Sequence, residues 1–339
     1  MPRRAYSVQT AKQDSVIMAQ KDPDDPITFG ERLVGTFLFM PVLLTRFLPY
    51  RWRVPVAGWL VAHVLAPLAG YRRRVRDNLA LVCPELSKDE VERLVRRVPN
   101  NVGRNMIELY SPEFPDHVRP SRTYGPGIKI LQKARDEGRP CVLMSAHLGN
   151  FNAARIGIIE NGITSAGYFY RNMSNRPFNA HYVDAMASVS QPIFEQSRKG
   201  MVQMIKHLKT GGFLGILGDL NAHDGLPLEY FGRPALTSIS GAEMALKYNA
   251  PMVPIWGIRK ENGMDFEIVF EDEIPHSDPL TMTREFNARL EAMVRANMDQ
   301  WFWIHRRWKD GENELGEMRA KDLAELEAKI AAQKIATNN

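Results

Sequence analysis

The sequence predicts an α/β sandwich with a largely parallel sheet, preceded by helices that associate with a membrane. In the middle of the chain, short apolar runs alternate with helical patterns, as is typical of a parallel sheet covered by helices. Near the N-terminus, two longer apolar runs lie among arginines without any acidic residue. The 339 residues are 44% hydrophobic and 24% charged, which excludes a disordered or coiled-coil chain.

The first 76 residues divide into a lead-in and a membrane-associated segment. Residues 1–26 are polar and lack the apolar core of a signal peptide, so we expect a flexible lead over residues 1–30. The apolar runs Leu33–Leu44 and Val54–Gly70 are short for spans, which need roughly 20 apolar residues. We expect helices lying in the membrane interface over residues 31–76. A true span and packing as core helices are the alternatives.

The net charge of +5 is local to this segment. No Asp or Glu occurs from Leu33 to Arg76, whereas seven arginines do, and the rest of the chain is formally −2. This distribution points to one anionic surface and away from nucleic acid, and phospholipid head groups fit it. Only two cysteines occur, Cys83 and Cys141, which indicates a reducing compartment, and their neighbours offer no metal-ligand spacing.

The α/β domain is expected over residues 77–310. The run Ser87–Glu90 is a capping box that predicts a helix through Val98, and Asn101–Leu109 predicts a further helix. Buried strands are predicted at Cys141–Ala146, Thr164–Tyr170, Phe213–Leu217, Met252–Ile258 and Phe266–Phe270. Helices are predicted at Ala153–Ile159, Arg198–Leu208, Ser240–Tyr248 and Arg284–Gln300. A polar helical tail over residues 311–339 carries Leu323, Leu326 and Ile330 on one side.

A candidate catalytic residue lies at the end of the first predicted strand, Cys141–Ala146. His147 follows that strand and precedes a helix, and ligands of open α/β sheets bind at the carboxyl ends of strands. Gly149 would let the backbone approach a substrate, and the helix start offers N–H groups to an oxyanion. A neutral imidazole there can take a proton from a hydroxyl. Taken alone, one histidine at a strand end is more often structural.

Further short sequence motifs occur in a specific order along residues 30–310. They are Arg72–Leu79 with Cys83-Pro84-Glu85, Ser145–Asn152, Tyr170-Arg171 with Asn175–Pro177, Gly218-Asp219, Phe231–Ala235 with Thr237, Ala250–Pro254, and Gln300–Lys309. Together they resemble the bacterial lipid A late acyltransferases of the lysophospholipid acyltransferase superfamily. The resemblance implies a three-layer α/β/α sandwich of the glycerolipid acyltransferase type. It also implies transfer of a fatty acyl chain from an acyl-carrier protein to a hydroxyl of a membrane lipid, without a cofactor or metal.

The resemblance also implies a catalytic pair with one departure. The family motif is His, four residues, then Asp or Glu, so that His147 would be the general base and Asn152 stands where the acid belongs. Asparagine can accept a hydrogen bond but carries no charge to stabilise an imidazolium. Three interpretations are open. Asn152 is an inactivating substitution, His147 works alone or with another carboxylate such as Asp219, or the chain binds lipid without catalysis.

The resemblance suggests further substrate-binding residues: Gly149, Asn150, Arg171, Arg198, Asp219 and Arg233. Arginines can grip phosphate or carboxylate groups bidentately. Internal salt bridges are the alternative for Arg171 and Arg233, and a solvated helix start for Arg198. Thr237 is expected to cap the next helix. For Trp301, Trp303 and Trp308, a membrane-interface belt and packing under the sheet remain open.

The acceptor and donor also remain open at this stage. A lipid A precursor is favoured, at the cytoplasmic face of the inner membrane of a Gram-negative bacterium. A lyso-aminolipid acceptor would need the same base but fewer arginines, because a zwitterionic head carries less charge. Acyl-CoA is possible in place of the carrier protein, and membrane phospholipids are the remaining partner.

Overall fold

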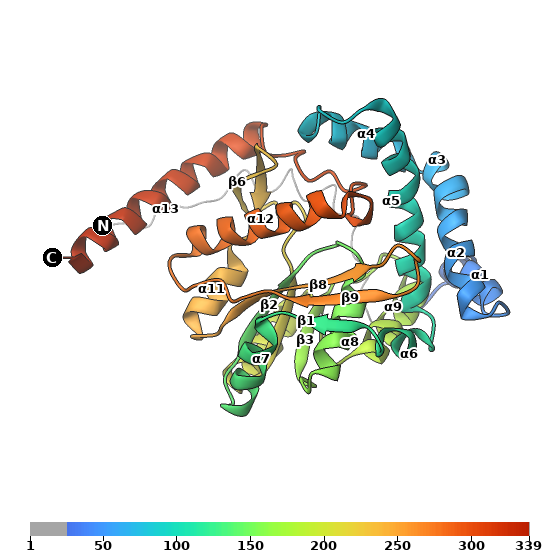
Figure 1. Ribbon diagram of the computed structural model, residues 1–339, viewed down its shortest axis with the longest axis horizontal. Coiled ribbons are helices and arrows are strands. Elements are labelled where there is room, and N and C mark those ends of the chain that lie inside the picture. The colour runs from blue at the N-terminus through green and yellow to red at the C-terminus, as the bar shows by residue number, and fades with distance from the viewer. Residues whose placement is uncertain (1–25, 339) are drawn as a thin grey trace.

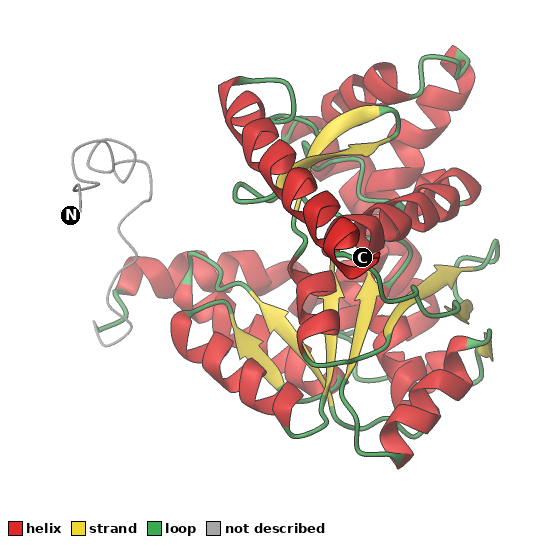
Figure 2. Ribbon diagram, turned by 90° about the vertical axis from the view of Figure 1, so that its left-hand side faces the viewer, coloured by secondary structure: helices red, strands yellow, loops and turns green. Residues whose placement is uncertain are grey.

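A computed structural model describes residues 26–338, and it centres on a seven-stranded sheet between helices (Figures 1 and 2). The expected flexible lead lies mostly outside the described residues. The strand order is β1-β9-β8-β2-β5-β3-β4, and every pairing is parallel except that of β8 with β9. The strands are β1 Arg122–Tyr124, β2 Cys141–Ser145, β3 Ala166–Tyr170, β4 Ile193–Glu195, β5 Phe213–Leu217, β8 Met252–Arg259 and β9 Phe266–Phe270. The predicted α/β class with a largely parallel sheet is confirmed.

Strand β2 lies at the centre of the sheet because its residues are apolar on both sides. Val142 and Met144 belong to one hydrophobic core, with α11 and α12, whereas Cys141 and Leu143 belong to a second core, with α7 and α8. Side chains of a strand alternate between faces, so a strand buried on both faces reads as a continuous apolar run. This is why the five apolar strands are predictable from the sequence. The edge strands β1 and β4 have three residues each, too few for a pattern.

Helices cover both faces of the sheet. In chain order after the N-terminal segment they are α5 Lys88–Leu109, α6 Phe114–Val118, α7 Gly127–Asp136, α8 Phe151–Glu160, α9 Arg176–Val189, α10 Arg198–Lys209, α11 Ser240–Lys247, α12 Pro279–Ala296, the short 3₁₀ helix η4 Met298–Gln300 and α13 Glu314–Asn338. An antiparallel hairpin, β6 Leu226–Tyr230 with β7 Arg233–Thr237, stands apart from the main sheet. The sequence patterns did not predict this hairpin.

Helix α5 corrects the expectation of two separate helices. The predicted capping box is present, with Ser87 and Glu90 bonded to each other's backbone, but the helix continues through Pro99 to Leu109. Tertiary packing keeps it helical past the proline. A Cβ at Gly103 would lie 2.7 Å from the Ala57 carbonyl oxygen of α2, so the two helices run in close contact. Burial along α2 therefore outweighs the local cost of the proline.

The N-terminal segment forms α1 Phe29–Thr45, α2 Tyr50–Leu60, the π-helical turn η3 Val61–Leu65, α3 Ala66–Leu68 and α4 Tyr71–Val82. Its inner residues pack on the domain, and many of its exposed residues are large and apolar. Phe37 is 74% exposed, Phe47 87% and Leu68 83%. Among the described helices none is by itself long and apolar enough to cross a membrane, and one bent pair, Tyr50–Leu68 with Tyr71–Val82, passes that test jointly.

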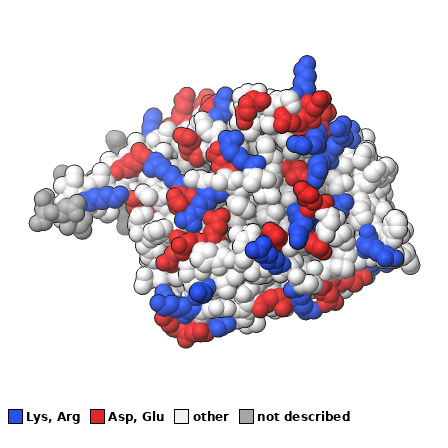
Figure 3. All heavy atoms as spheres, in the orientation of Figure 1, with Lys and Arg blue, Asp and Glu red and all other residues white. Residues whose placement is uncertain are grey.

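The seven arginines of this segment do not all face outward. Arg53 is buried and forms an ion pair with Glu113 at 2.9 Å, and Arg76 pairs with Glu92 at 2.6 Å. Part of the local positive charge is therefore neutralised within the protein. In Figure 3 the end of the molecule built from the first helices is mostly uncharged, while Lys, Arg, Asp and Glu are intermixed elsewhere on the visible face.

The polar tail forms the predicted helix, α13, and its apolar side packs on the domain. Leu323, Leu326 and Ile330 contact a small core formed by residues of the β6–β7 hairpin and α12. An ion pair between Lys334 Nζ and Asp278 Oδ2, at 2.9 Å, adds to this packing.

Asp278 is expected to stabilise both α12 and the tail. It is the N-cap of α12, accepting from the Thr281 N–H at 2.9 Å. Burial raises the pKa of its carboxyl, but the bonds from Thr281 and Lys334 outweigh burial and lower it to about 2. Replacing Asp278 by alanine should lower the free energy of unfolding by about 1 kcal/mol at pH 7. Since the folded pKa is depressed, the contribution is present above about pH 4 and lost as the pH falls toward 2.

Urea unfolding of the Asp278→Ala protein at pH 7 and pH 2 tests this. The difference from the parent should be present at pH 7 and shrink at pH 2. Glu325→Ala, at an exposed position of α13, is the control and should leave stability unchanged. Equal stability of Asp278→Ala and the parent at pH 7 would contradict the assignment.

Candidate active site

The centre of the site is a hydrogen-bonded pair of His147 and Asp219. The ring Nδ1 of His147 and Asp219 Oδ1 are 2.9 Å apart, and the His147 backbone N–H donates to Asp219 Oδ2 at 2.9 Å. The sheet register explains this meeting. Ser145 of β2 lies opposite Leu217 of β5, and each functional residue follows two positions later on its own strand. Neighbouring parallel strands thus deliver both side chains to the same edge.

Asp219 is buried and held by donors on both oxygens. In addition to the two bonds from His147, the indole Nε1–H of Trp301 donates to Oδ2 at 2.9 Å. Burial raises the pKa of the Asp219 carboxyl, but the charge of His147 and these three donors outweigh burial and lower it below its ordinary value. The carboxylate is therefore ionised near neutral pH.

The ionised carboxylate sets the tautomer of the imidazole. An anion only accepts hydrogen bonds, so Nδ1 carries the proton and the lone pair of His147 lies on Nε2. The side chain of His147 is 26% exposed. The rings of Phe151 and Phe302 flank it, with centroids 5.6 and 5.8 Å away. Nε2 is thus a base at a partly open, apolar-rimmed site.

Asn152 lies away from this pair, which corrects its expected role as the acid partner. The side chain is buried, and its Oδ1 accepts from Arg155 Nη1 at 2.8 Å. Arg155 is itself buried and also donates to the Met186 carbonyl and to Ser190. Asp219, which the sequence suggested both as a substrate-binding residue and as another carboxylate for His147, is the carboxylate beside His147. This contact is the one that the second interpretation of Asn152 requires.

Gly149 and Asn150 are buried and form hydrogen bonds that hold the loop after His147. Asn150 is fully buried, caps α8 by accepting from the Asn152 N–H at 2.9 Å, and donates to Glu108. The Gly149 N–H donates to the Gln300 carbonyl at 3.0 Å. Gly149 has φ +60°, where a Cβ would lie 2.0 Å from the Gly257 carbonyl oxygen, so glycine is required for this close approach. The contacts of both residues within the protein support the loop, and their expected contact with a substrate stays a prediction.

The three predicted arginines differ in their surroundings. Arg171, directly after β3, and Arg198, the first residue of α10, are exposed, and the structure gives neither an ion pair within residues 26–338. Arg233 instead pairs with Glu312 at 2.8 Å and donates to the Leu81 carbonyl. The internal salt bridge considered for Arg233 is therefore present.

His305 is a site residue that the sequence analysis did not single out. Its Nε2 accepts from the backbone N–H of Asn221 at 2.9 Å. Asn221 lies two positions after Asp219. Burial lowers the pKa of His305 to about 4, so this imidazole is neutral near pH 7. It lies within the Gln300–Lys309 fragment, so the fragment marks the right part of the chain without marking this residue.

The tryptophans of the same fragment pack inside the protein. Trp301, Trp303 and Trp308 are 2%, 0% and 6% exposed and form an aromatic cluster with Tyr230 and Phe231 of the hairpin. This corrects the alternative of a membrane-interface belt. Thr237, expected to cap α11, instead accepts from Arg307 Nη2, and Ile239 is the N-cap residue of that helix.

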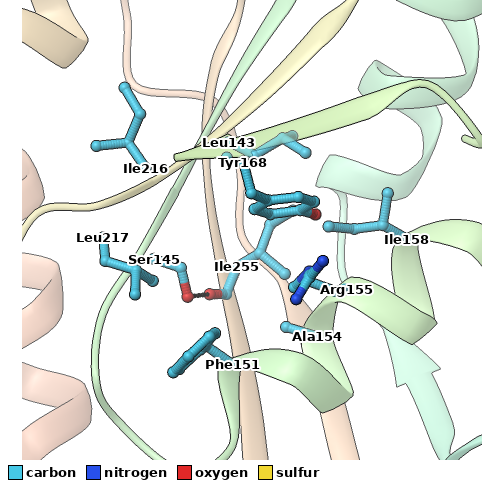
Figure 4. Close-up of a pocket in the computed structure, with 11 residues that line it drawn as sticks. Leu143, Ser145, Phe151, Ala154, Arg155, Ile158, Tyr168, Ile216, Leu217 and Ile255 are labelled. Carbon is cyan, nitrogen blue, oxygen red and sulfur yellow. Dashed lines mark hydrogen bonds between the residues drawn. The ribbon is translucent and has the colours of Figure 1, made fainter. Parts of the chain in front are cut away.

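A narrow apolar cavity of about 20 Å³ is lined by residues of β2, α8, β3, β5 and β8 (Figure 4). One of its lining residues, Phe151, also lies next to the imidazole of His147, with ring centroids 5.6 Å apart. Most of its wall is aliphatic, and Arg155 lies against the ring of Tyr168, 4.5 Å from its centroid. Ser145 Oγ is tied to the Ile255 carbonyl at 2.7 Å and is not available as a nucleophile. Among residues 26–338, no three His, Cys, Asp or Glu side chains are grouped to hold a metal ion.

A partly exposed imidazole, held by a buried carboxylate at the carboxyl edge of a parallel sheet, is the arrangement of a general-base site. Comparison with known proteins identifies the family. The family model described as bacterial lipid A biosynthesis acyltransferase matches residues 29–310, and the chain belongs to that family.

Curated relatives are distant but cover most of the chain. A lipid A biosynthesis lauroyltransferase of Escherichia coli K12 is 24% identical over 69% of this chain and 78% of its own length. A lipid A biosynthesis acyltransferase of Haemophilus influenzae is 21% identical over 76% and 83%, respectively. A phosphatidylinositol mannoside acyltransferase of Mycolicibacterium smegmatis is 20% identical over 70% and 80%.

Proposed function

We propose that the chain transfers a fatty acyl group from an acyl thioester to a hydroxyl of a membrane lipid, with His147 as the general base. The hydrogen bond between His147 Nδ1 and the buried Asp219 carboxylate carries this proposal, because it leaves Nε2 free to accept a proton. Membership of the lipid A acyltransferase family supports the acyl chemistry. Asn152 lies in α8 and bonds to Arg155, not to His147. Its lack of charge therefore does not prevent His147 from acting as a base.

The mechanism uses one proton and no acyl-enzyme. Nε2 of His147 takes the proton of the acceptor hydroxyl while the oxygen attacks the thioester carbonyl, and Asp219 stabilises the imidazolium that forms. The tetrahedral intermediate then collapses, the C–S bond breaks, and the imidazolium returns the proton to the leaving thiolate. The products are an ester and a free thiol, and the histidine is neutral again. Trp301 and the His147 backbone N–H keep the carboxylate in place throughout.

A lipid A precursor is the favoured acceptor, and acyl-carrier protein the favoured donor. The relatives named for lipid A acylation support both choices. Arg171 and Arg198 are exposed and suit phosphate groups of such a lipid. We place the reaction at the cytoplasmic face of the inner membrane of a Gram-negative bacterium, where the apolar outer side of α1–α3 would rest on phospholipid.

A lyso-aminolipid acceptor is the second candidate, and one observation favours it. Arg233 is engaged with Glu312, which leaves two of the three predicted arginines for a head group. A zwitterionic head needs fewer cations than a bis-phosphorylated one. The relative named as a phosphatidylinositol mannoside acyltransferase supports variation of the acceptor within this group of proteins.

Side-by-side assays with the purified chain test the function and separate the acceptors. An acyl-carrier-protein thioester, and acyl-CoA in parallel, would be offered with a lipid A precursor or a lyso-aminolipid. Ester formation with one acceptor identifies it, and a deletion strain should then lack one lipid A acyl chain or accumulate the lyso-aminolipid. Failure to consume any thioester, with vesicle binding retained, would contradict the proposal and support a non-catalytic lipid-binding protein.

A further inference from the structure

A buried ion pair lies behind the loop that begins at His147. Glu108 comes from the last turn of α5 and Arg259 from the end of β8, and their side chains are 0% and 3% exposed. The guanidinium binds both carboxylate oxygens, with N–O distances of 2.6 and 2.5 Å. Neither residue contacts His147 or Asp219, so the pair is separate from the site described above.

Two further hydrogen bonds of this ion pair lead elsewhere, from the Tyr50 hydroxyl to Glu108 Oε1 at 3.5 Å and from Arg259 Nη1 to the Gly263 carbonyl at 3.1 Å, and the others lead toward the loop after His147. Glu108 Oε2 accepts from the side-chain amide of Asn150 at 2.7 Å. Arg259 Nη2 donates to Asn105 Oδ1 at 2.7 Å, and the amide of Asn105 donates in turn to the Gly149 carbonyl at 2.5 Å. Each charged group therefore reaches the loop, one directly and one through a single asparagine.

The other side of the loop is tied to the same arginine. The Gly149 N–H donates to the Gln300 carbonyl, and the side chain of Gln300 forms two bonds, of 2.9 and 2.8 Å, with the backbone of Arg259. Both backbone polar groups of Gly149 are thus held by residues bonded to Arg259. Since Gly149 also sits against the Gly257 carbonyl, the loop has little freedom to shift.

Stability alone gives a weak reason for this arrangement. A buried ion pair costs desolvation, and replacing it by apolar side chains is often neutral or stabilising. An apolar pair at these two positions would, however, leave the amides of Asn105 and Asn150 without their present partners. What the charged pair adds to the backbone contacts of Gly149 and Asn150 is the bond from Asn150 to Glu108 and the orientation of Asn105 toward the Gly149 carbonyl.

We propose that Glu108 and Arg259 are positioning residues that hold the His147 loop in place against Asp219. The inference rests on the proposed acyl transfer, in which Nε2 must meet the acceptor hydroxyl at hydrogen-bonding distance. Asp219 fixes the imidazole from the side of β5, and the ion pair fixes the following backbone from the side of α5 and β8. A displacement of about 1 Å at such a site can cost about 100-fold in rate.

The test replaces the pair without leaving a lone buried charge. In the Glu108→Leu/Arg259→Met protein, kcat should fall about 100-fold, while the KM values for donor and acceptor stay within about threefold. Arg259→Lys keeps the charge but loses the planar fork, so its kcat should lie between those of the parent and the double variant. Nitrogen NMR of the histidine rings should show the His147 resonances shifted or broadened in the double variant.

A second buried arginine provides the matched control. Arg53 is 5% exposed and pairs with Glu113, and its described bonds go to α1, α6 and the segments next to them, not to the loop. Arg53→Met/Glu113→Gln should leave kcat in detergent-dispersed substrate and the His147 resonances unchanged.

The outcomes separate this inference from the proposed function. If Glu108→Leu/Arg259→Met keeps full kcat and parental His147 resonances while Asp219→Asn loses activity, the ion pair is merely structural and the inference is overturned. If the parent turns over no thioester, the proposed function fails. The ring resonances then still decide whether the loop depends on the pair, with unchanged resonances overturning the inference.

Discussion

Replacing Asp219 by asparagine is expected to lower the turnover of acyl transfer by about 10⁴-fold. The same exchange beside a catalytic histidine of a serine protease costs about that much, because the amide favours the wrong tautomer and carries no charge to stabilise the imidazolium. Here the carboxylate is buried, accepts from His147 Nδ1 at 2.9 Å and receives two further N–H donors, so no solvent group can replace it. Steady-state kinetics with an acyl-carrier-protein donor measures the loss.

Position 152 supplies the control for this prediction. Asn152→Asp restores the residue type of the family motif, but the side chain there faces Arg155 and not His147. We therefore expect its turnover to stay within about threefold of the parent, because the new carboxylate would pair with the buried guanidinium. Thermal unfolding of both variants checks that they fold. A gain of orders of magnitude in Asn152→Asp, with Asp219→Asn unaffected, would restore Asn152 as the position of the catalytic acid.

The contrast between these two positions shows what the sequence could predict of the site. The place of His147 between a buried strand and a helix makes it only a candidate, and the order of fragments along the chain, which indicates the family, strengthens it. The partner of His147 depends on which strands are neighbours and on their register, here Ser145 opposite Leu217. A fixed spacing along the chain cannot carry that information, whereas Asp219, two residues after a predicted strand, becomes the partner once β2 and β5 are known to pair.

The fold shows the same difference between local sequence patterns, which are predictable, and contacts between residues far apart in the sequence, which are not. Five largely apolar strands, the capping box at Ser87 and the apolar side of α13 are local patterns, and the structure confirms them. The continuation of α5 through Pro99 depends on contact with α2. The burial of Trp301 depends on its contact with Tyr230 of the β6–β7 hairpin. Glu108 and Arg259 are 151 positions apart, so no sequence pattern joins them.

The exposed apolar side of the first helices leads to the second large expected effect. Phe37 and Phe47 of the α1 region are 74% and 87% exposed, and the neighbouring α2 exposes Trp52 and Trp59 by more than half. Large apolar and indole side chains on one side of a helical layer fit a membrane interface. The bent geometry of the helices that follow, 84° between Tyr50–Leu68 and Tyr71–Val82, also suits a layer lying on the membrane better than a straight span.

Changing Phe37 and Phe47 to glutamate should therefore lower partitioning onto vesicles by about 100-fold or more. Burial of one phenylalanine side chain contributes about 1.5–3 kcal/mol, and two lost contacts together exceed the 2.7 kcal/mol that corresponds to 100-fold. Sedimentation with vesicles of phosphatidylethanolamine and phosphatidylglycerol measures the partition coefficient. Turnover of detergent-dispersed substrate should stay near that of the parent, because neither side chain belongs to the site around His147.

A matched pair on the tail shows whether the position or only the added charge matters. Met318 and Ile335 of α13 are 50% and 66% exposed, similar in kind to the phenylalanines but on a different element. Met318→Glu/Ile335→Glu adds the same two charges and should leave vesicle binding almost unchanged. Equal losses in both double variants would mean that net charge alone governs binding. Retained binding of Phe37→Glu/Phe47→Glu would mean that α1 does not lie on the membrane, and the contact would then have to come from the bent pair Tyr50–Leu68 and Tyr71–Val82, which includes α2.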